Sequence, residues 1–238
     1  MHWFYSQNIK DGKIILEEEE AKHALKVLRL KANEEVMVIN GTGGLYHCRL
    51  DQCSKKEVSA AIINEQLNHK ARPYSIHIAI APTKNISRFE WFLEKSTEIG
   101  IDKISPILCH RSERKIIKNE RLQRVLLAAC KQSQKAYLPS LAPLEKFEHF
   151  VNNCKEQNKF IAHCDYENNQ QLLHLAKAKK EVLIMIGPEG DFSEKEVDFA
   201  ISKGFLAVGL GKERLRTETA GLVACQSIHF INQKESSE

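Results

Sequence analysis

The feature that most constrains the fold of this chain is an alternation of apolar and amphipathic segments after residue 71. The apolar segments are short and continuous, as in strands that are buried on both faces of a parallel sheet. The segments between them have the apolar spacing of helices. This alternation predicts a parallel α/β domain. Strands are expected at 75–82, 103–110, 159–164, 181–187 and 205–211, and helices at 87–100, 119–134, 168–179, 193–203 and 217–232.

The first 70 residues have a different pattern, with short strands and one helix. Gly41–Gly44 supplies a hairpin turn between two of the strands. A polar, proline-containing stretch at 68–74 separates the two patterns. We therefore expect a small β-barrel domain over 1–70 and an α/β domain over 71–238. Strands are expected at 13–16, 34–40, 45–51 and 57–64, and a helix over 19–30 that buries Ala21, Ala24, Leu25, Val27 and Leu28.

Two helix starts carry the spelling of a capping box, in which a serine and a glutamate three residues later bond each other's backbone N–H groups. They are Ser87 with Glu90 and Ser193 with Glu196. Helices are therefore expected to begin directly after Ser87 and Ser193.

The charge of the chain is concentrated in its middle. The net charge is only +4, but residues 71–140 hold 13 Lys and Arg against 6 Asp and Glu. A local basic excess is the expected footprint of a polyanion such as nucleic acid. On charge alone, a solvated helical face is the favoured explanation of this excess.

Several classes of protein are disfavoured by composition and spacing. No apolar run is long enough to span a bilayer, and the N-terminus lacks the pattern of a signal peptide, so we expect a cytoplasmic protein without membrane contact. The seven cysteines contain no CxxC pair. This absence argues against a disulfide framework and against a metal site.

Loops at the carboxyl ends of the last three strands are the candidate ligand site, because open α/β sheets bind ligands there. They lie near 163–168, at 187–191 and at 209–220, and the second and third are rich in glycine. The third loop does not match a dinucleotide fingerprint, since Arg214 stands at the third glycine position. It is not a P-loop either, because neither Ser nor Thr follows Lys212.

These two glycine-rich segments, 186–196 and 208–224, together resemble the paired signature of the RsmE family, ribosomal RNA uridine-N3 methyltransferases of the SPOUT class. Further matches to the family lie at 23–30, at Lys84 with 94–100, and at 132–139, so the resemblance covers the whole chain. The chain departs from the family pattern at Asp191, where a glycine is usual, at Lys135, where an arginine is usual, and at Glu213–Arg214.

The resemblance implies a PUA-like barrel followed by a trefoil-knotted methyltransferase domain that uses S-adenosyl-L-methionine. It also implies a homodimer whose substrate is small-subunit (16S) ribosomal RNA, free or in the assembled subunit. The residues that would hold the methyl donor are Ile186, Gly187, Pro188, Glu189, Gly190, Val208, Leu210, Gly211, Leu215, Thr217 and Ala220.

Catalysis would require removal of the uracil N3 proton, since neutral N3–H has no lone pair for attack. Arg216 is the candidate to stabilise the uracil anion and Glu218 the candidate base. Glu218 fits equally well as a charge that stabilises a helix N-terminus, and for Glu189 a structural role is favoured. The RNA contacts would come from Arg29, Lys84, Arg88, Arg111, Arg114 and Lys135.

Two alternatives stay open on the sequence alone. One is a different SPOUT activity, such as methylation of ribose or guanine in RNA. The other is a non-catalytic, ribosome-associated RNA-binding protein with the α/β domain as a scaffold.

Overall fold

The computed structural model describes residues 1–54, 57–164 and 170–234. Contacts divide the chain into two compact units, of which the first contains residues 1–71 and also 127–138, and the second contains 72–126 and 139–238. The inclusion of 127–138 in the first unit was not expected from the sequence. It follows from a small apolar cluster in which Ile39 and Leu45 pack with Cys130 and Ala136.

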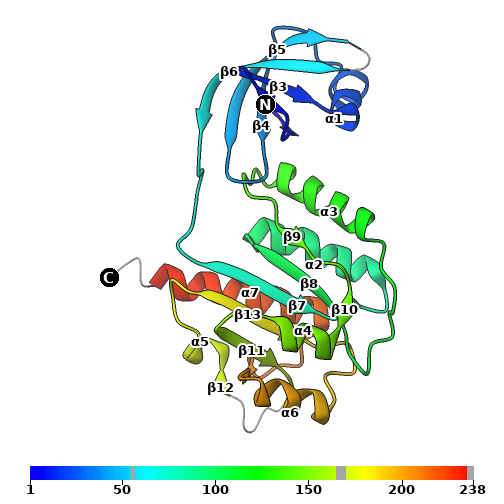
Figure 1. Ribbon diagram of the computed structural model, residues 1–238, viewed down its shortest axis with the longest axis vertical. Coiled ribbons are helices and arrows are strands. Elements are labelled where there is room, and N and C mark those ends of the chain that lie inside the picture. The colour runs from blue at the N-terminus through cyan, green and yellow to red at the C-terminus, as the bar shows by residue number, and fades with distance from the viewer. Residues whose placement is uncertain (55–56, 165–169, 235–238) are drawn as a thin grey trace. The chain divides into compact units, whose positions relative to one another are not determined.

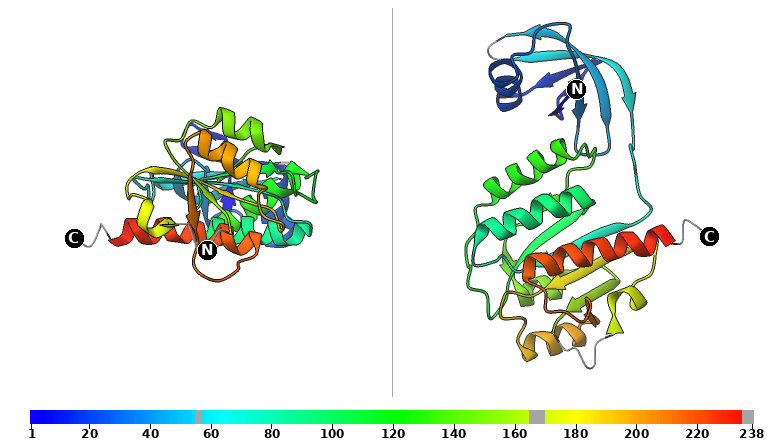
Figure 2. Two further views of the ribbon diagram at one scale, coloured as in Figure 1. Left: turned by 90° about the horizontal axis from the view of Figure 1, so that it is seen from below. Right: turned by 180° about the vertical axis from the view of Figure 1, so that it is seen from behind.

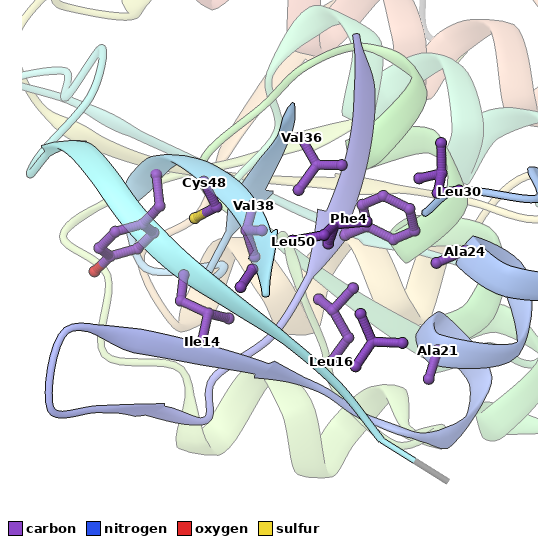
Figure 3. Close-up of a cluster of buried hydrophobic side chains, with 13 residues drawn as sticks. Phe4, Ile14, Leu16, Ala21, Ala24, Leu30, Val36, Val38, Cys48 and Leu50 are labelled. Carbon is purple, nitrogen blue, oxygen red and sulfur yellow. The ribbon is translucent and has the colours of Figure 1, made fainter. Parts of the chain in front are cut away.

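The first unit is built on a six-stranded sheet in the order β1-β4-β5-β6-β3-β2, in which β1 and β4 run parallel and the other neighbours antiparallel. Its core follows the period of two along the strands, so that Val36 and Val38 are both fully buried. Figure 3 shows Phe4 and Leu16 in the same cluster. The strands are β1 (His2–Tyr5), β2 (Ile9–Lys10), β3 (Lys13–Leu16), β4 (Glu35–Ile39), β5 (Leu45–Cys53) and β6 (Val58–Gln66).

The predicted hairpin turn at Gly41–Gly44 is confirmed. The side chain of Asn40 accepts hydrogen bonds from the N–H groups of Thr42 and Gly44, at 2.9 and 2.8 Å. Within the same unit, the N–H of Gly43 donates to the carbonyl of Ala136 at 3.0 Å. The segment 127–138 is therefore joined to this turn by backbone hydrogen bonds as well as by apolar packing.

The helix expected over 19–30 begins as α1 (Glu18–Lys22) and continues as a π-helix, η1 (His23–Val27). The N–H of Leu28 bonds the carbonyl of His23, five residues back, so the turn is wider than in an α-helix. Ala21 and Ala24 are buried as predicted, but Val27 is 67% exposed. The prediction for Val27 was wrong because the wider turn rotates it out of the apolar face.

The second unit contains the predicted parallel sheet, in the order β10-β8-β7-β13-β11-β14-β12, with β9 paired to β8. All of these pairs are parallel. The long strands are β7 (Ser75–Ile80), β8 (Lys103–Leu108), β11 (Asn158–Ala162), β13 (Glu181–Ile186) and β14 (Leu206–Gly209). The short ones are β9 (Ser140–Leu141), β10 (Glu145–Lys146) and β12 (Gln170–Gln171).

Helices cover both faces of this sheet (Figures 1 and 2). Helices α2 and α7 pack together on one face, and α4 and α6 lie on the other. The trefoil knot stays a prediction. The helices are α2 (Ile86–Ile99), α3 (Asn119–Gln132), α4 (Phe147–Asn153), α5 (Leu172–Leu175), α6 (Glu194–Ser202) and α7 (Thr217–Lys234).

Two local predictions need correction. The capping box at Ser193 and Glu196 is confirmed, but helix α2 is capped by Asn85, whose side chain accepts from the N–H of Ser87. Asn is as good a cap as Ser, so the helix begins two residues earlier than predicted. The helix expected over 168–179 is only the single turn α5, and residues 165–169, which include part of the predicted loop at 163–168, lie outside the described residues.

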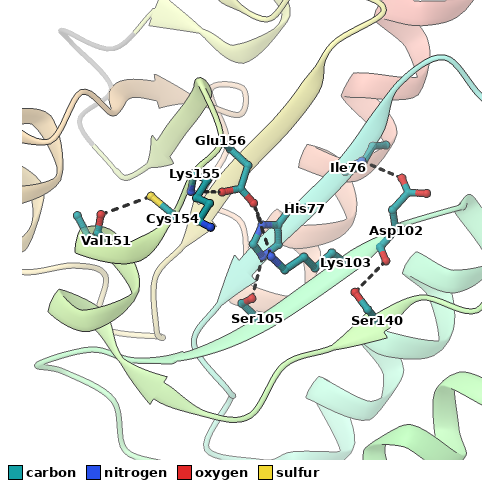
Figure 4. Close-up of polar contacts among 10 residues, drawn as sticks. All are labelled: Ile76, His77, Asp102, Lys103, Ser105, Ser140, Val151, Cys154, Lys155 and Glu156. Carbon is teal, nitrogen blue, oxygen red and sulfur yellow. Dashed lines mark hydrogen bonds and ion pairs between the residues drawn. The ribbon is translucent and has the colours of Figure 1, made fainter.

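The second unit contains a cluster of hydrogen-bonded polar side chains centred on the buried His77 of its sheet (Figure 4). His77 of β7 lies between Glu156, 2.6 Å from its Nδ1, and Ser105, 2.8 Å from its Nε2. A neutral imidazole satisfies both partners when Nδ1 donates to the carboxylate and Nε2 accepts from the hydroxyl. Burial lowers the pKa of His77, and the hydrogen bond from His77 lowers the pKa of Glu156 to about 2.

Glu156→Gln is expected to lower the free energy of unfolding at pH 7 by about 1–3 kcal/mol, the usual cost of impairing a buried hydrogen-bonded group. The lowered pKa of Glu156 means that its contribution is fully present above the ordinary value of 4.5 and is lost as the pH falls towards 2. The difference between wild type and variant should therefore shrink on acidification. Urea denaturation at pH 7 and pH 4 measures it, and equal stability at pH 7 would contradict the assigned hydrogen bond.

Candidate functional site

A cavity of about 660 Å³ lies at the carboxyl edge of the parallel sheet, a size typical of small-ligand sites. Its walls come from the loop after β13 and from the segment that leads into α7. A smaller cavity of about 70 Å³ adjoins it and is lined by the loop after β14. The two share Ala162, Cys164, Leu215 and Ala220.

Every residue predicted to hold the methyl donor lines one of these two cavities. The neighbouring strands β13, β11 and β14 explain this, because their carboxyl ends meet at one edge of the sheet. The larger cavity is lined by Ile186, Gly187, Pro188, Glu189, Gly190 and Thr217. The smaller cavity is lined by Val208, Leu210 and Gly211. Both are lined by Leu215 and Ala220.

The loop after β13 is held in place by groups outside it. Arg111, which follows β8, donates from Nη1 to the carbonyls of Gly190 and Phe192, at 2.8 and 3.2 Å. Glu189 accepts from the backbone N–H of Lys84 at 2.8 Å, the structural role expected for it. These bonds fix the loop without help from a ligand.

Asp191, at a position where the resemblance suggests glycine, has a φ of +62°. Asp tolerates this left-handed conformation better than most residues, because its short side chain bonds nearby backbone. Here its carboxylate accepts from the N–H of Phe192 at 2.8 Å and from the N–H of Cys164 at 2.9 Å. The second bond ties the loop after β13 to the loop after β11 across the cavity wall.

The loop after β14 depends on Gln171 of β12, which the sequence analysis did not single out. Gln171 accepts from the N–H of Gly211 at 2.7 Å. Gly211 has a φ of +117°, which strains any L-residue, while its missing Cβ would meet nothing within 4 Å. The glycine is thus required here for backbone conformation.

The predicted catalytic pair stands at the start of α7. Arg216 is exposed and lines the larger cavity, and its guanidinium has no hydrogen-bond or ion-pair partner among the residues that the structure describes. Glu218 is only 6% exposed, and its Oε2 has no hydrogen-bond partner in the described part of the chain. Its Oε1 lies 3.8 Å from Nε of Arg88.

A buried carboxylate oxygen without a partner is costly and uncommon. Stabilisation by the dipole of α7 does not by itself account for the burial of Glu218. This oxygen keeps the capacity to accept a proton, although Glu218 itself lines neither cavity, and the guanidinium of Arg88 lies beside the other oxygen.

The basic residues of the second unit that are predicted to contact RNA differ from one another in exposure and in bonding partners. Arg88 is exposed and lines the larger cavity. Lys84 is exposed and forms an ion pair of 2.7 Å with Glu113. The guanidinium of Arg114 donates to the carbonyls of Thr83 and Lys84, so that it, like Arg111, holds backbone.

The other two predicted RNA contacts lie in the first unit. Arg29 is exposed just after the π-helix and has a φ of +56°. Lys135 is half-buried near the end of the segment 127–138, and its carbonyl accepts from the thiol of Cys130.

Within 1–54, 57–164 and 170–234, no group of three or more His, Cys, Asp or Glu could hold a metal ion. All seven cysteines are free thiols. No helix in the described part of the chain is long and apolar enough to cross a membrane.

Comparison with known families gives two matches. Residues 70–229 match the model of an RNA methyltransferase domain, and residues 16–63 match the model of an RNA methyltransferase PUA domain. The first match contains all the residues that line the two cavities.

Individual relatives resemble the chain over almost its full length. Ribosomal RNA small subunit methyltransferase E of Aquifex aeolicus is 30% identical over 224 residues, which cover 92% of this chain and 95% of that protein. The structure of a probable rRNA methyltransferase from Porphyromonas gingivalis has a TM-score of 0.90 and 37% identity, and covers 99% of this chain and all of the other. The structure of ribosomal RNA small subunit methyltransferase E from Neisseria gonorrhoeae bound to S-adenosyl methionine has a TM-score of 0.88 and 28% identity, and covers 98% of both chains.

Proposed function

We propose that this chain, which belongs to the ribosomal RNA small subunit methyltransferase E family, transfers a methyl group from S-adenosylmethionine to N3 of a uridine in small-subunit (16S) ribosomal RNA. The observation that carries the proposal is the cavity after β13, which the unpaired guanidinium of Arg216 lines at the start of α7. Next to it is the buried carboxylate of Glu218, one oxygen of which has no hydrogen-bond partner among the described residues.

The residues present fit the donor. The walls combine apolar side chains, such as Ile186 and Leu215, with backbone groups of glycine-rich loops, which suits an adenosine that is recognised through backbone hydrogen bonds. The loops are already fixed by Arg111, Asp191 and Gln171, so little conformational entropy is lost on binding. When bound, the donor supplies an electrophilic methyl group on a sulfonium.

The chain's own task is to present N3 of uracil as an anion. Glu218 directly follows the cavity-lining Thr217 and is the proposed acceptor of the N3 proton. Arg216 places a fixed positive charge where the uracil oxygens gain negative charge. Arg88 lies beside Glu218, with its Nε 3.8 Å from Oε1.

RNA recognition is proposed to use Arg88 and Lys84 in the second unit and Arg29 and Lys135 in the first. The family resemblance further supports a cytoplasmic homodimer and a trefoil knot in the second unit. Arg111 and Arg114 are proposed to hold the loops around the donor and not to contact RNA, because their guanidinium groups bond backbone carbonyls.

The proposed function is tested by incubating the protein with S-adenosylmethionine and small-subunit RNA, either free or in assembled subunits, followed by mass analysis of the nucleosides. 3-Methyluridine is the expected product, and calorimetry is expected to show donor binding. Methylated ribose or guanine would indicate another activity of this enzyme class. RNA binding without donor binding would indicate a non-catalytic protein.

A further inference from the structure

A third cavity, of about 510 Å³, lies at the same carboxyl edge of the parallel sheet, and the methyl-transfer chemistry makes no use of it. It is bounded by the residues after β8, by the start of α4 and by the start of α6. We call it the flanking cavity. Its volume is in the range of sites that bind a small molecule or a single nucleotide.

The rim of the flanking cavity is basic. Lys115, Lys146 and Lys195 come from three separate segments and are all exposed. Among the residues that the structure describes, none of the three has an ion-pair partner. Converging, unpaired ammonium groups favour an anion such as phosphate, since the structure does not otherwise neutralise them.

The acidic residues of the lining do not cancel this charge. Glu196 is buried, and both its oxygens are already engaged, one by the N–H of His110 at 2.8 Å and the other by the N–H of Ser193 at 2.8 Å. Glu148 is the one other carboxylate among the lining residues described. The rim therefore keeps an excess of positive charge.

The floor of the flanking cavity is apolar and aromatic. Phe147 is buried and Phe199 half-buried, and Leu108 closes the end of β8 beside them. An aromatic surface below a basic rim is the combination that binds an unstacked base together with its phosphate in single-stranded RNA.

The flanking cavity adjoins the donor cavity. Gly190 and Asp191 line the donor cavity, and Ser193 lines the flanking cavity. Arg111 bonds Gly190 on one side, and its neighbour Ser112 lines the flanking cavity on the other. An RNA strand whose uridine reaches the donor therefore passes close to the flanking cavity.

We propose that the flanking cavity binds a nucleotide next to the target uridine, with its phosphate on Lys115, Lys146 and Lys195 and its base against Phe199. The inference rests on the proposed function, because the strand must enter the donor cavity. It adds a substrate subsite in which none of the residues takes part in methyl transfer.

The test compares two double variants with the same change of charge. Lys146→Ala/Lys195→Ala removes two ammonium groups from the rim. Lys177→Ala/Lys180→Ala removes two exposed lysines before β13, at the opposite edge of the sheet. RNA affinity is measured over a range of salt concentrations, and donor affinity by calorimetry.

The rim variant is expected to bind substrate RNA about tenfold more weakly at moderate salt, and its slope of log affinity against log salt should be shallower by about 1.4, the value for two phosphate contacts to a single strand. The control variant should match wild type, and both should keep wild-type donor affinity. A wild-type salt slope in the rim variant overturns the inference. Failure of the proposed function is distinct, since wild type itself would then bind no donor or methylate no RNA.

A second measurement concerns the aromatic floor. RNA that carries 4-thiouridine next to the target is crosslinked by light, and the crosslinked peptides are identified by mass spectrometry. Crosslinks in the segments 108–115, 146–148 or 193–203 are expected, because these segments line the flanking cavity. Crosslinks confined to other segments of the chain would overturn the placement of the flanking base.

Discussion

Arg216→Ala is expected to slow methyl transfer on the order of 100-fold while the donor dissociation constant stays near that of wild type, since removing one preorganised charge-stabilising group has about this effect. The guanidinium lines the cavity without a partner among the described residues, so its charge is available to the substrate. Raising the pH should partly rescue the variant, because more uracil ionises unaided. Single-turnover rates with saturating RNA and donor, measured across pH, give the result directly.

Two further variants sharpen this experiment. Arg216→Lys keeps the charge but loses the planar fork, and should have an intermediate rate. Lys212→Ala removes an exposed charge nearby that lines neither donor cavity, and should behave as wild type. Equal rates for wild type and Arg216→Ala would exclude a catalytic role. A slow variant with collapsed donor affinity would make Arg216 a donor-binding residue.

Arg111→Ala is expected to raise the donor dissociation constant about tenfold or more. The guanidinium bonds two carbonyls of the loop after β13, and hydrogen bonds from charged groups contribute about 1.5–3 kcal/mol each. A loss of about 1.4 kcal/mol in the organisation of the loop already corresponds to a tenfold change in affinity. Calorimetric titration with S-adenosylmethionine measures it.

The same variant separates two roles for this arginine. If Arg111 holds the loop, the slope of log RNA affinity against log salt should stay unchanged, whereas a phosphate contact would make the slope shallower when lost. Arg124→Ala is the matched control, since Arg124 is exposed on α3 and lines none of the three cavities. Unchanged donor affinity together with a shallower salt slope would return Arg111 to RNA binding.

The long strands of the second unit could be predicted because each is buried on both faces, and burial dictates an apolar run. The strand β1 gave no such signal, since only Phe4 of its four residues is buried and its pairing with β4 joins segments some distance apart in sequence. Helix α4 was missed because seven residues are too few to establish a helical period. In the first unit, the π-helix changed which residues were buried, and no sequence pattern signals that change at Val27.

Some features of the candidate site could likewise be predicted from the sequence and others could not. Its glycine-rich loops could be predicted because backbone conformation restricts the residue type there, as at Gly211. The side chains that hold these loops could not, because each bonds backbone far away in sequence. Arg111 reaches Gly190 across 79 residues, Gln171 reaches Gly211 across 40, and Asp191 reaches Cys164 across 27. The local sequence does not indicate which backbone groups these side chains bond.

The discontinuity of the first unit has a consequence for how the protein is made. Residues 1–71 are synthesised first, but the segment 127–138 that completes their unit emerges only after more than fifty further residues. Until then the apolar side chains of Ile39 and Leu45 lack Cys130 and Ala136, with which they pack in the finished unit. A nascent chain therefore leaves this small apolar cluster uncovered while the first strands of the next unit are already leaving the ribosome. A gene fragment that ends at residue 71 encodes an unfinished unit.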